Sequence, residues 1–340
     1  METHFSSLSL LFLFLFISSS LPSPSLSASV RCHPNDRRVL LSIKESLNNP
    51  PILASWKPNT DCCNWDQVEC HPRTDRITLL IISKINTPVQ IPEAVGDLPY
   101  LERLIFTEMN LTGSIPYSIT KLNNLKFLRV WITTLSSPIP EFIGQLKNLE
   151  YLDLSDNQLY GPIPSSLGNL NKLTGLQLEK NKLTGSIPDS FGRFKNKLDW
   201  FDVSHNLLSG KIPNSLGELD CKTTSMADNK LVGDASILFK ENGRTTSIDL
   251  SNNRLDFDLA KVRFPKNVTY VQLSHNRIRG SIPEQVTELV NLEVMDLSYN
   301  RLCGKIPFGG KVQELGLYSF EHNRCLCGSP LPACKSIRSP

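Results

Sequence analysis

The chain has 340 residues, a formal net charge of +3 and nine cysteines. The balance of 36 basic against 33 acidic residues is too even for a protein that binds nucleic acid by neutralising phosphates. A hydrophobic content of 40% excludes a disordered chain and a protein that crosses a membrane many times. The length favours two domains or an array of repeats over one compact globule.

The first 28 residues are predicted to be a secretory signal peptide. A short apolar run, Leu10–Ile17, precedes a stretch rich in Ser and Pro that ends in small residues at Ser27–Ser29. A membrane anchor is the alternative, but the run is too short to span about 30 Å of hydrocarbon. No later segment is apolar enough to insert into a membrane. We therefore expect a soluble, secreted, extracellular protein.

The cysteines gather at the two ends of the mature chain. In an oxidising compartment, four cysteines at each end predict two disulfides at each end. A zinc site that includes His33, His71 or His322 is the alternative, which secretion disfavours. Cys221 stands alone, and we expect it to be a buried thiol that packs as a small apolar residue. The expected pairs are Cys32–Cys62, Cys63–Cys70, Cys303–Cys325 and Cys327–Cys334.

A unit of about 24 residues repeats through the middle of the chain. The dipeptide Ile-Pro recurs eight times, and with degenerate copies at Ala235 and Leu259 the ten positions lie 23 to 25 residues apart. Around them the unit reads L-x-x-L-x-L-x-x-N-x-L-x-G-x-I-P, most clearly from Leu149 to Pro164. This pattern is that of a leucine-rich repeat.

The repeat predicts an α/β fold. Each L-x-L is a short strand with one apolar face, and stacking the units buries these faces in one continuous core. The result is a right-handed leucine-rich-repeat solenoid with a parallel β-sheet on its concave face, single helical turns on its convex side and disulfide-capped ends. The expected divisions are an N-terminal cap at 29–75, ten repeats at 76–307 and a C-terminal cap at 308–340.

The repeated Asn is expected to turn inward and satisfy backbone groups that would otherwise be buried unpaired. This residue is absent at Ile85, Met109 and Thr133, so we expect the N-terminal third to be less regular. The predicted ladder consists of Asn157, Asn181, Asn206, Asn229, Asn253, Asn276 and Asn300.

No catalytic motif stands out from the repeat. Ser204-His205-Asn206 and Ser274-His275-Asn276 occupy the same turn of two units, which indicates the repeat pattern rather than a catalytic site. We expect no enzymatic activity, no cofactor and no metal. Two sequons, at Asn110 and Asn267, predict glycosylation in a secreted chain.

The G-x-I-P form of the repeat resembles that of plant extracellular leucine-rich-repeat proteins. Three segments, Asp61-Cys62-Cys63-Asn64-Trp65, Gly233-Asp234-Ala235-Ser236 and residues 325–332 (CLCGSPLP), resemble the polygalacturonase-inhibiting proteins, as do the ten repeats without a kinase. The match covers roughly residues 30 to 335. It implies a defence protein of the plant cell wall and apoplast that binds and inhibits fungal or insect polygalacturonases through its concave face, with pectin as a second candidate partner.

The resemblance also suggests binding residues. Asp153 and Glu179 match acidic positions that family members use against the enzyme's cationic cleft. Ser225 stands where the family commonly has an outward Asp, and Trp131 is displaced by one place, a step that can turn a side chain to the other face. Aromatic residues dominate interface energies and acidic rows steer basic partners, although core packing of the tryptophans is the alternative. The residues expected to face outward and bind are Asp153, Glu179, Trp131, Tyr151, Trp200, Asp202, Ser225 and Asp249.

Two other functions fit the same scaffold. A plant antifreeze protein is similar to this inhibitor family, so an ice-binding surface is one alternative. Ice binding requires a regular array of small polar groups, which Glu, Lys and aromatic residues interrupt here. The other alternative is a soluble partner of a receptor kinase.

Overall fold

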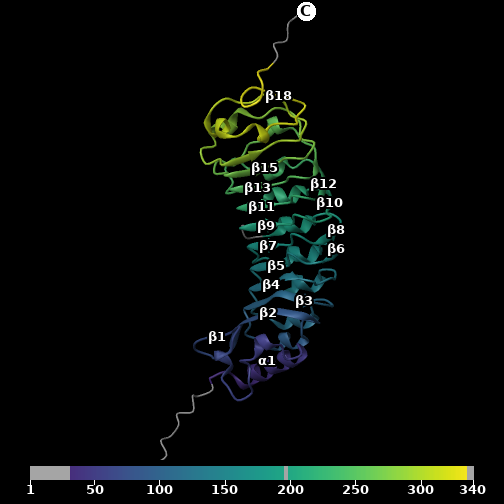
Figure 1. The fold of residues 1–340 in the computed structure, drawn as a ribbon, viewed down its shortest axis with the longest axis vertical. Helices are drawn as coiled ribbons and strands as arrows, with labels where there is room; N and C mark the ends of the chain where they lie inside the picture. The colour runs from purple at the N-terminus through teal and green to yellow at the C-terminus, as the bar shows by residue number, and fades with distance from the viewer. Residues whose placement is uncertain (1–30, 195–197, 335–340) are drawn as a thin grey trace, which may run out of the picture.

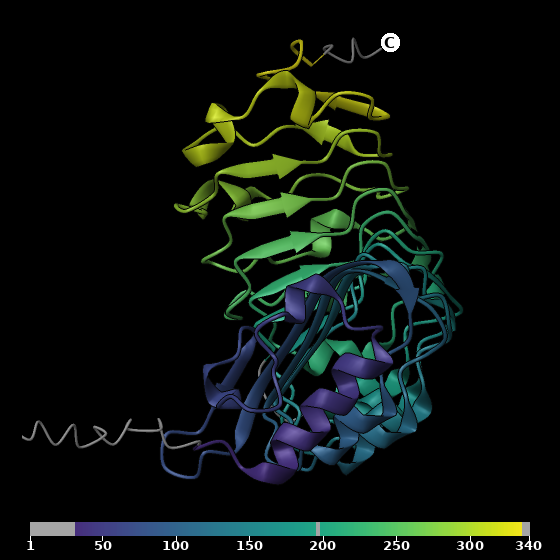
Figure 2. The ribbon, with the colours of Figure 1, turned by 60° about the horizontal axis from the view of Figure 1, so that its bottom comes forward.

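The computed structural model describes residues 31–194 and 198–334, so the expected signal peptide lies outside the described residues. Strands stack one above another along the length of a curved solenoid, from the N-terminal cap to the C-terminal end (Figure 1). In Figure 2 the strands of the C-terminal half of this sheet lie side by side in sequence order. The solenoid expected from the repeat is confirmed.

The helices are short except for the first. They are α1 (Pro34–Ser46) and the single 3-10 turns η1 (Pro51–Leu53), η2 (Cys62–Asn64), η3 (Glu93–Asp97), η4 (Tyr117–Lys121), η5 (Glu141–Gln145), η6 (Ser165–Asn169), η7 (Asp189–Arg193), η8 (Asn214–Glu218), η9 (Ser236–Leu238), η10 (Leu259–Lys261), η11 (Glu284–Glu288), η12 (Gly310–Glu314) and η13 (Leu317–Ser319).

The strands form one long sheet and three small ones. They are β1 (Val68–Cys70), β2 (Ile77–Val89), β3 (Arg103–Leu111), β4 (Phe127–Thr133), β5 (Tyr151–Asp153), β6 (Tyr160–Pro162), β7 (Gly175–Gln177), β8 (Lys182–Thr184), β9 (Trp200–Asp202), β10 (Ser209–Lys211), β11 (Thr223–Ser225), β12 (Lys230–Gly233), β13 (Ser247–Asp249), β14 (Arg254–Leu255), β15 (Tyr270–Gln272), β16 (Val294–Asp296), β17 (Cys303–Lys305) and β18 (Cys325–Cys327).

The long sheet contains β1, β2, β3, β4, β5, β7, β9, β11, β13, β15 and β16 in that order. Strand β1 pairs antiparallel with β2 and belongs to the N-terminal cap, and the other neighbours in the sheet pair in parallel. Each L-x-L pair points into the core, so Leu152 and Leu154 are fully buried. The sheet lines the concave side of the solenoid (Figure 1).

The N-terminal cap begins with α1, which closes the open end of the core. Pro34 occupies the first turn, where its missing N–H costs nothing, and Leu40 and Ile43 are fully buried. Asp36, also buried, accepts hydrogen bonds from Arg76 Nε at 2.9 Å and Nη2 at 2.8 Å and from the backbone N–H of Ile77. This bidentate pair fastens the helix to the start of β2.

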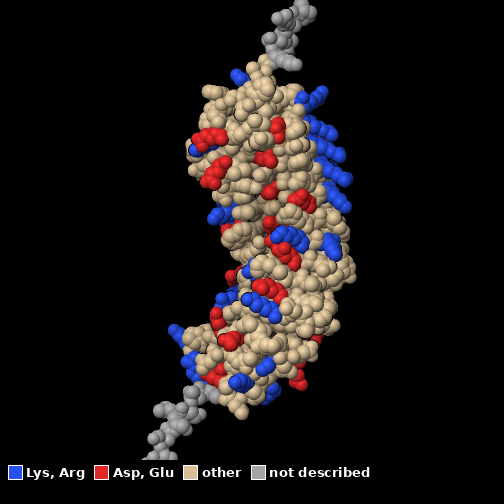
Figure 3. Space-filling model, viewed as in Figure 1, with Lys and Arg blue, Asp and Glu red and all other residues tan. Residues whose placement is uncertain are grey.

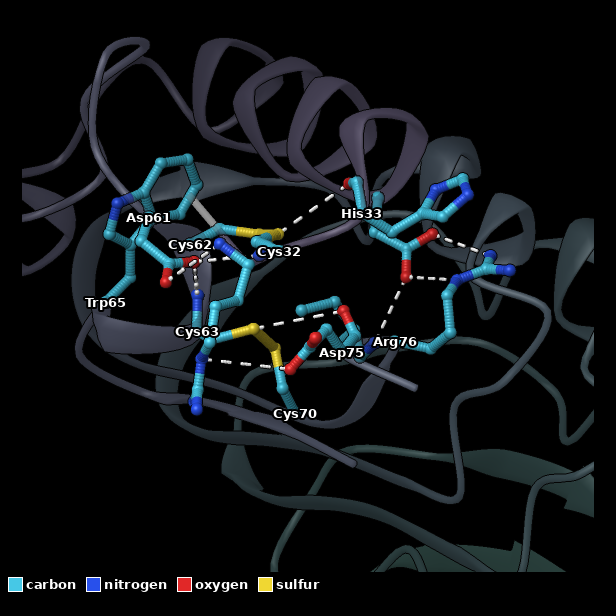
Figure 4. Close-up of a disulfide and its surroundings, with 12 residues drawn as sticks. Cys32, His33, Asp61, Cys62, Cys63, Trp65, Cys70, Asp75 and Arg76 are labelled. Atoms are coloured by element: carbon cyan, nitrogen blue, oxygen red, sulfur yellow. Dashed lines mark hydrogen bonds and ion pairs between the residues drawn. A yellow bond between two sulfur atoms is a disulfide. The ribbon is translucent and has the colours of Figure 1, made fainter. Parts of the chain in front are cut away.

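Disulfides close both ends of the solenoid. The structure contains the pairs Cys32–Cys62, Cys63–Cys70, Cys303–Cys325 and Cys327–Cys334, which are the pairs expected from the sequence. In the N-terminal cap the Asp61 carboxylate lies between two of the cysteines and accepts hydrogen bonds from the backbone N–H groups of Cys32 and Cys63 (Figure 4). Burial alone raises the pKa of Asp61, but these N–H groups and that of Arg31 hold it below its usual value.

The asparagine ladder is confirmed at all seven predicted positions. Asn181 is typical: its Nδ2 donates to the carbonyls of Leu154 at 2.9 Å and Leu178 at 3.1 Å, and its Oδ1 accepts from the N–H of Leu159 at 2.9 Å. Each Asn thus links its own turn to the turn of the preceding unit. The same contacts recur at Asn323, so the ladder continues one layer into the expected C-terminal cap.

The N-terminal third departs from the repeat, as expected, and it does so through longer strands. Where the ladder residue is missing, β2, β3 and β4 run for 13, 9 and 7 residues, although most later strands of the sheet have three. Ile85, Met109 and Thr133 occupy the ladder position and are buried. Ile85 and Met109 pair across the sheet, as do Met109 and Thr133, so the backbone bonds of a longer sheet replace the side-chain amides.

The convex side carries the expected helical turns, which follow the Ile-Pro dipeptides. Glycine lets successive turns approach closely: a Cβ at Gly144 or Gly168 would collide with the backbone carbonyl of Ser166 or Ser190 in the next unit.

Among the described residues, no helix is long and apolar enough to cross a membrane.

Candidate binding face

Equivalent residues of successive strands line up on the concave sheet. The pairing places Phe127, Tyr151, Gly175 and Trp200 in one column, and in the next column Arg129 pairs with Asp153, which pairs with Gln177. Side chains in one column are about 4.8 Å apart. The second column continues through Asp202, Ser225, Asp249, Gln272 and Asp296.

Asp153 lies on this face, but the expectation that it is exposed is wrong. The residue is 0% exposed. Its Oδ2 forms an ion pair with Arg129 Nε at 2.8 Å, and its Oδ1 accepts from the hydroxyl of Ser155 at 2.5 Å. The strand alternation correctly predicts the face of the sheet but not that neighbouring side chains cover the carboxylate.

The same arrangement holds the other expected acids. Asp202 and Asp249 are partly buried, and the Oδ1 of each accepts from the N–H and hydroxyl of the serine two residues later. Burial raises the pKa of Asp202, and the bonds from Ser204 oppose that rise. The main structural role of the D-x-S pattern in these repeats is therefore to form a local hydrogen-bonded turn.

Ser225 lies in the unit where this turn is absent. The two positions of the pattern are Ser225 and Ala227, so the carboxylate and its partner hydroxyl are replaced together. Ser225 is partly buried in β11 and pairs with Asp202 on one side and Asp249 on the other. Ser225 thus interrupts the acidic column, as Gln177 and Gln272 also do.

Glu179 is the acid on this face with the most perturbed titration. Gln177 Nε2 donates to its Oε1 at 3.4 Å, and its Oε2 has no hydrogen-bond partner among the described residues. Burial, followed by the charges of Asp202, Asp153 and Asp156, raises the pKa of Glu179 to about 7. The centre of the face therefore changes its charge near neutral pH.

Two of the predicted aromatic residues flank Gly175. The Tyr151 ring stacks on Phe127 with centroids 4.8 Å apart and also covers Gly175, where an added Cβ would lie 2.5 Å from the ring. Burial and Asp153 raise the pKa of Tyr151 to about 12. Trp200 is 48% exposed, so it is not a core residue. The first column thus offers an aromatic surface for contact.

Trp131 lies on the concave face despite its displaced position in the sequence. The Arg129 guanidinium lies 4.2 Å from its ring centroid, and its Nε1 donates to Asp156 Oδ2 at 3.3 Å. Trp131 is partly buried. The structure therefore brings Trp131, Tyr151, Asp153 and Glu179 together, and Trp200 and Asp202 lie beside them.

A column with a backbone conformation that the sequence did not reveal runs along the edge of this face. The residue before each ladder position has a left-handed backbone, with φ between 48° and 57°. An L-residue pays about 1–2 kcal/mol for this conformation. Late in the column, Tyr299 stacks between His275 and His322 with centroids 4.1 and 4.2 Å apart. The column consists of Lys84, Glu108, Ile132, Asp156, Lys180, His205, Asp228, Asn252, His275, Tyr299 and His322.

A second missed feature is a row of basic residues, here called the basic ridge. In the C-terminal half the residue after each ladder Asn is Lys or Arg, and each of these side chains is exposed without an ion-pair partner among the described residues. Figure 3 shows Lys and Arg in a stripe along one edge of this half. A basic residue at that place in every unit after residue 229 is the signal that the sequence offered. The basic ridge consists of Lys230, Arg254, Arg277, Arg301 and Arg324.

The remaining expected sites lie away from the concave centre. Asn267 is exposed, and Asn110, at the end of β3, accepts a hydrogen bond from the Thr134 hydroxyl at 2.8 Å. The sulfur atoms of Cys32, Cys63 and Cys70 lie within 4.8 Å of one another, but each is in a disulfide, which leaves no thiolate for zinc.

Comparison with known proteins places the chain among plant leucine-rich-repeat proteins. Residues 33–71 match the leucine-rich-repeat N-terminal domain, and five segments between 148 and 310 match the leucine-rich repeat. The chain is also similar to solved structures: a plant ice-binding protein (TM-score 0.87, 45% identity, 90% of this chain and 99% of that one) and the ectodomain of the receptor kinase GASSHO1/SCHENGEN3 from Arabidopsis thaliana (0.72, 30%, 86% and 36%).

The curated relatives are more specific. A polygalacturonase inhibitor of Vitis vinifera is 55% identical over 91% of this chain and 93% of its own length. Polygalacturonase inhibitor 1 of Arabidopsis thaliana is 55% identical over 89% and 93%, and a polygalacturonase inhibitor of Pyrus communis is 51% identical over 89% and 92%. With this identity over nearly the whole chain, and with the solenoid and its disulfide-closed ends, the protein belongs to the polygalacturonase inhibitor family.

Proposed function

We propose that this protein binds and inhibits a polygalacturonase through its concave face and acts as a binding protein rather than an enzyme. The observation that carries the proposal is the similarity to polygalacturonase inhibitors over about nine-tenths of the chain. The face supplies what an interface needs: an exposed Trp200 and rings already fixed by stacking. We further propose a fungal or insect enzyme as the target and a role in plant defence.

The test is the release of reducing ends from pectin by a polygalacturonase, with and without the purified protein. Trp200→Ala is expected to weaken inhibition about thirtyfold, because truncating an aromatic residue that anchors an interface costs about 2 kcal/mol or more. Tyr160→Ala is the matched control, since Tyr160 is also 48% exposed but lies on β6, outside the concave sheet. Equal inhibition by both variants would place the interface elsewhere.

Secretion is part of the proposal. Residues 1–28 act as a signal peptide, the mature chain comprises the cap, repeats and cap expected from the sequence, and the protein works in the plant cell wall or apoplast. The four disulfides support an oxidising compartment. Glycans are expected at Asn267 and Asn110. Mass spectrometry of protein purified from the apoplast checks the cleavage site and both glycans.

We also propose pectin, an acidic polysaccharide, as a second partner held by the basic ridge. The basic ridge has one charge in each repeat, so its charges recur about every 5 Å, the spacing of neighbouring strands. This spacing is shorter than the Debye length of about 8 Å at physiological ionic strength, so the charges act together on a polyanion. The double variant Arg277→Gln/Arg301→Gln should weaken binding to polygalacturonate at low salt. Arg38→Gln/Lys57→Gln removes the same charge from the N-terminal cap and should not. Equal binding by both variants would contradict the assignment.

Ice binding is the second candidate, favoured by the similarity to the plant ice-binding structure. On the concave face, however, aromatic and charged side chains interrupt the small polar groups. A thermal-hysteresis measurement decides this alternative, and normal ice growth at high protein concentration would exclude it. A partnership with a receptor kinase would instead appear as capture of a receptor ectodomain from cell-wall extract.

A further inference from the structure

Ile132 is the one β-branched residue in the left-handed column. Its φ is 48°, and the repeat requires such a backbone before each ladder position. The other ten members of the column are unbranched at Cβ or aromatic. A branched side chain is the least compatible with this conformation, because Cβ approaches the neighbouring backbone. The repeat thus explains the backbone at residue 132 but not the choice of isoleucine.

Packing does not explain the isoleucine either. Its side chain is 43% exposed, so much of the apolar surface that would offset the backbone strain remains in water. Neighbours in the same column make polar contacts instead: Asp156 pairs with Lys180 at 3.2 Å. A strained residue without compensation inside the folded chain points to a role outside it.

The residue before Ile132 is held in place. The Trp131 ring lies against the Arg129 guanidinium, and its Nε1 is hydrogen-bonded to Asp156, which the ion pair to Lys180 also fixes. An aromatic side chain fixed before binding loses little conformational entropy when a partner arrives. Trp131, on the concave face, is followed directly in β4 by the exposed Ile132, in the left-handed column at the edge of that face.

We propose that Trp131 and Ile132 form a preorganised apolar anchor that receives an apolar side chain of the target polygalacturonase, and that Ile132 determines which enzymes are held. This inference rests on the proposed function and adds a specificity-determining residue to it. The anchor selects among enzymes by the apolar side chain that covers Ile132.

The test replaces Ile132 with a residue that suits the backbone. Ile132→Asn should raise the thermal unfolding midpoint by about 2 °C, because relief of strain of this kind corresponds to a small shift in a chain of this size. The same variant should weaken binding to an inhibited polygalacturonase, with a Kd raised about tenfold. Ile132→Val keeps the branched Cβ and the backbone strain. It should raise the Kd about threefold without changing the thermal unfolding midpoint.

Lys84→Asn is the matched control, since Lys84 occupies the same left-handed position in β2, with φ 57°. It should leave the Kd unchanged. If Ile132→Asn binds within twofold of the wild type, or lowers the unfolding midpoint, the inference is wrong, although inhibition by the wild type would still support the proposed function. If the wild type inhibits no polygalacturonase, the proposed function fails and the inference fails with it.

Discussion

Removing one ladder amide tests how the repeats are held together. In Asn206→Ala the three carbonyls that accept from Nδ2, those of Leu178, Val203 and Ser204, each keep another donor: Asn181, Asn229 and the N–H of Lys180. The N–H of Leu183, which donates to Oδ1 at 2.9 Å, loses its partner in a fully buried residue. One orphaned buried N–H costs about 1–3 kcal/mol.

Three lost hydrogen bonds whose acceptors stay satisfied add about 1.5 kcal/mol in total, at the low end of the range for such bonds. We therefore expect Asn206→Ala to lower the free energy of unfolding by about 3 kcal/mol. Urea denaturation followed by circular dichroism measures the change. Asn214→Ala, at an exposed position at the start of η8, is the control and should stay within about 0.5 kcal/mol of the wild type. A loss below 1 kcal/mol for Asn206→Ala would refute the reasoning.

Three further predictions follow from buried groups. Asp36→Asn should cost about 3 kcal/mol, the low end of the range for breaking a buried ion pair, because Arg76 is only partly buried. Thermal unfolding checks this, and a shift under 2 °C would contradict it. The pKa of Glu179 in the folded protein is about 7, above its ordinary value of 4.5, so the folded state holds this proton more tightly than the unfolded state. The wild type should therefore lose stability relative to Glu179→Gln as pH rises from 5 to 7.5. An unfolding midpoint that changes equally with pH in both proteins would contradict this. Burial raises the pKa of Cys221 to about 11, so a thiol reagent should label one cysteine in denaturant and none in the native protein.

The features that the sequence predicted are those that repeat. Asn157 and the six later ladder residues recur at one place in each unit, and a buried amide at that place has one set of backbone partners to satisfy. The cysteines of each cap lie close together in the chain, which leaves few ways to pair them. Strand alternation likewise places Asp153, Glu179 and Trp200 on the concave face.

What the sequence did not predict depends on neighbours in other units. Asp153 and Asp249 are alike in the repeat, yet Asp153 is fully buried and Asp249 is only partly buried, because Arg129 reaches over Asp153 from the preceding strand. Ile132 reads as an ordinary apolar residue until its φ is known. The length of β2 was missed because apolar residues at the ladder position extend the sheet rather than end the strand.

Inhibition is the central claim, and one measurement tests it most directly. Purified protein is added to a panel of fungal and insect polygalacturonases, and the release of reducing ends is followed alongside the direct binding of each enzyme. We expect at least one enzyme to be slowed in proportion to the amount bound, with Trp200→Ala weakening both effects together. Full activity of every enzyme, without measurable binding, would contradict the account.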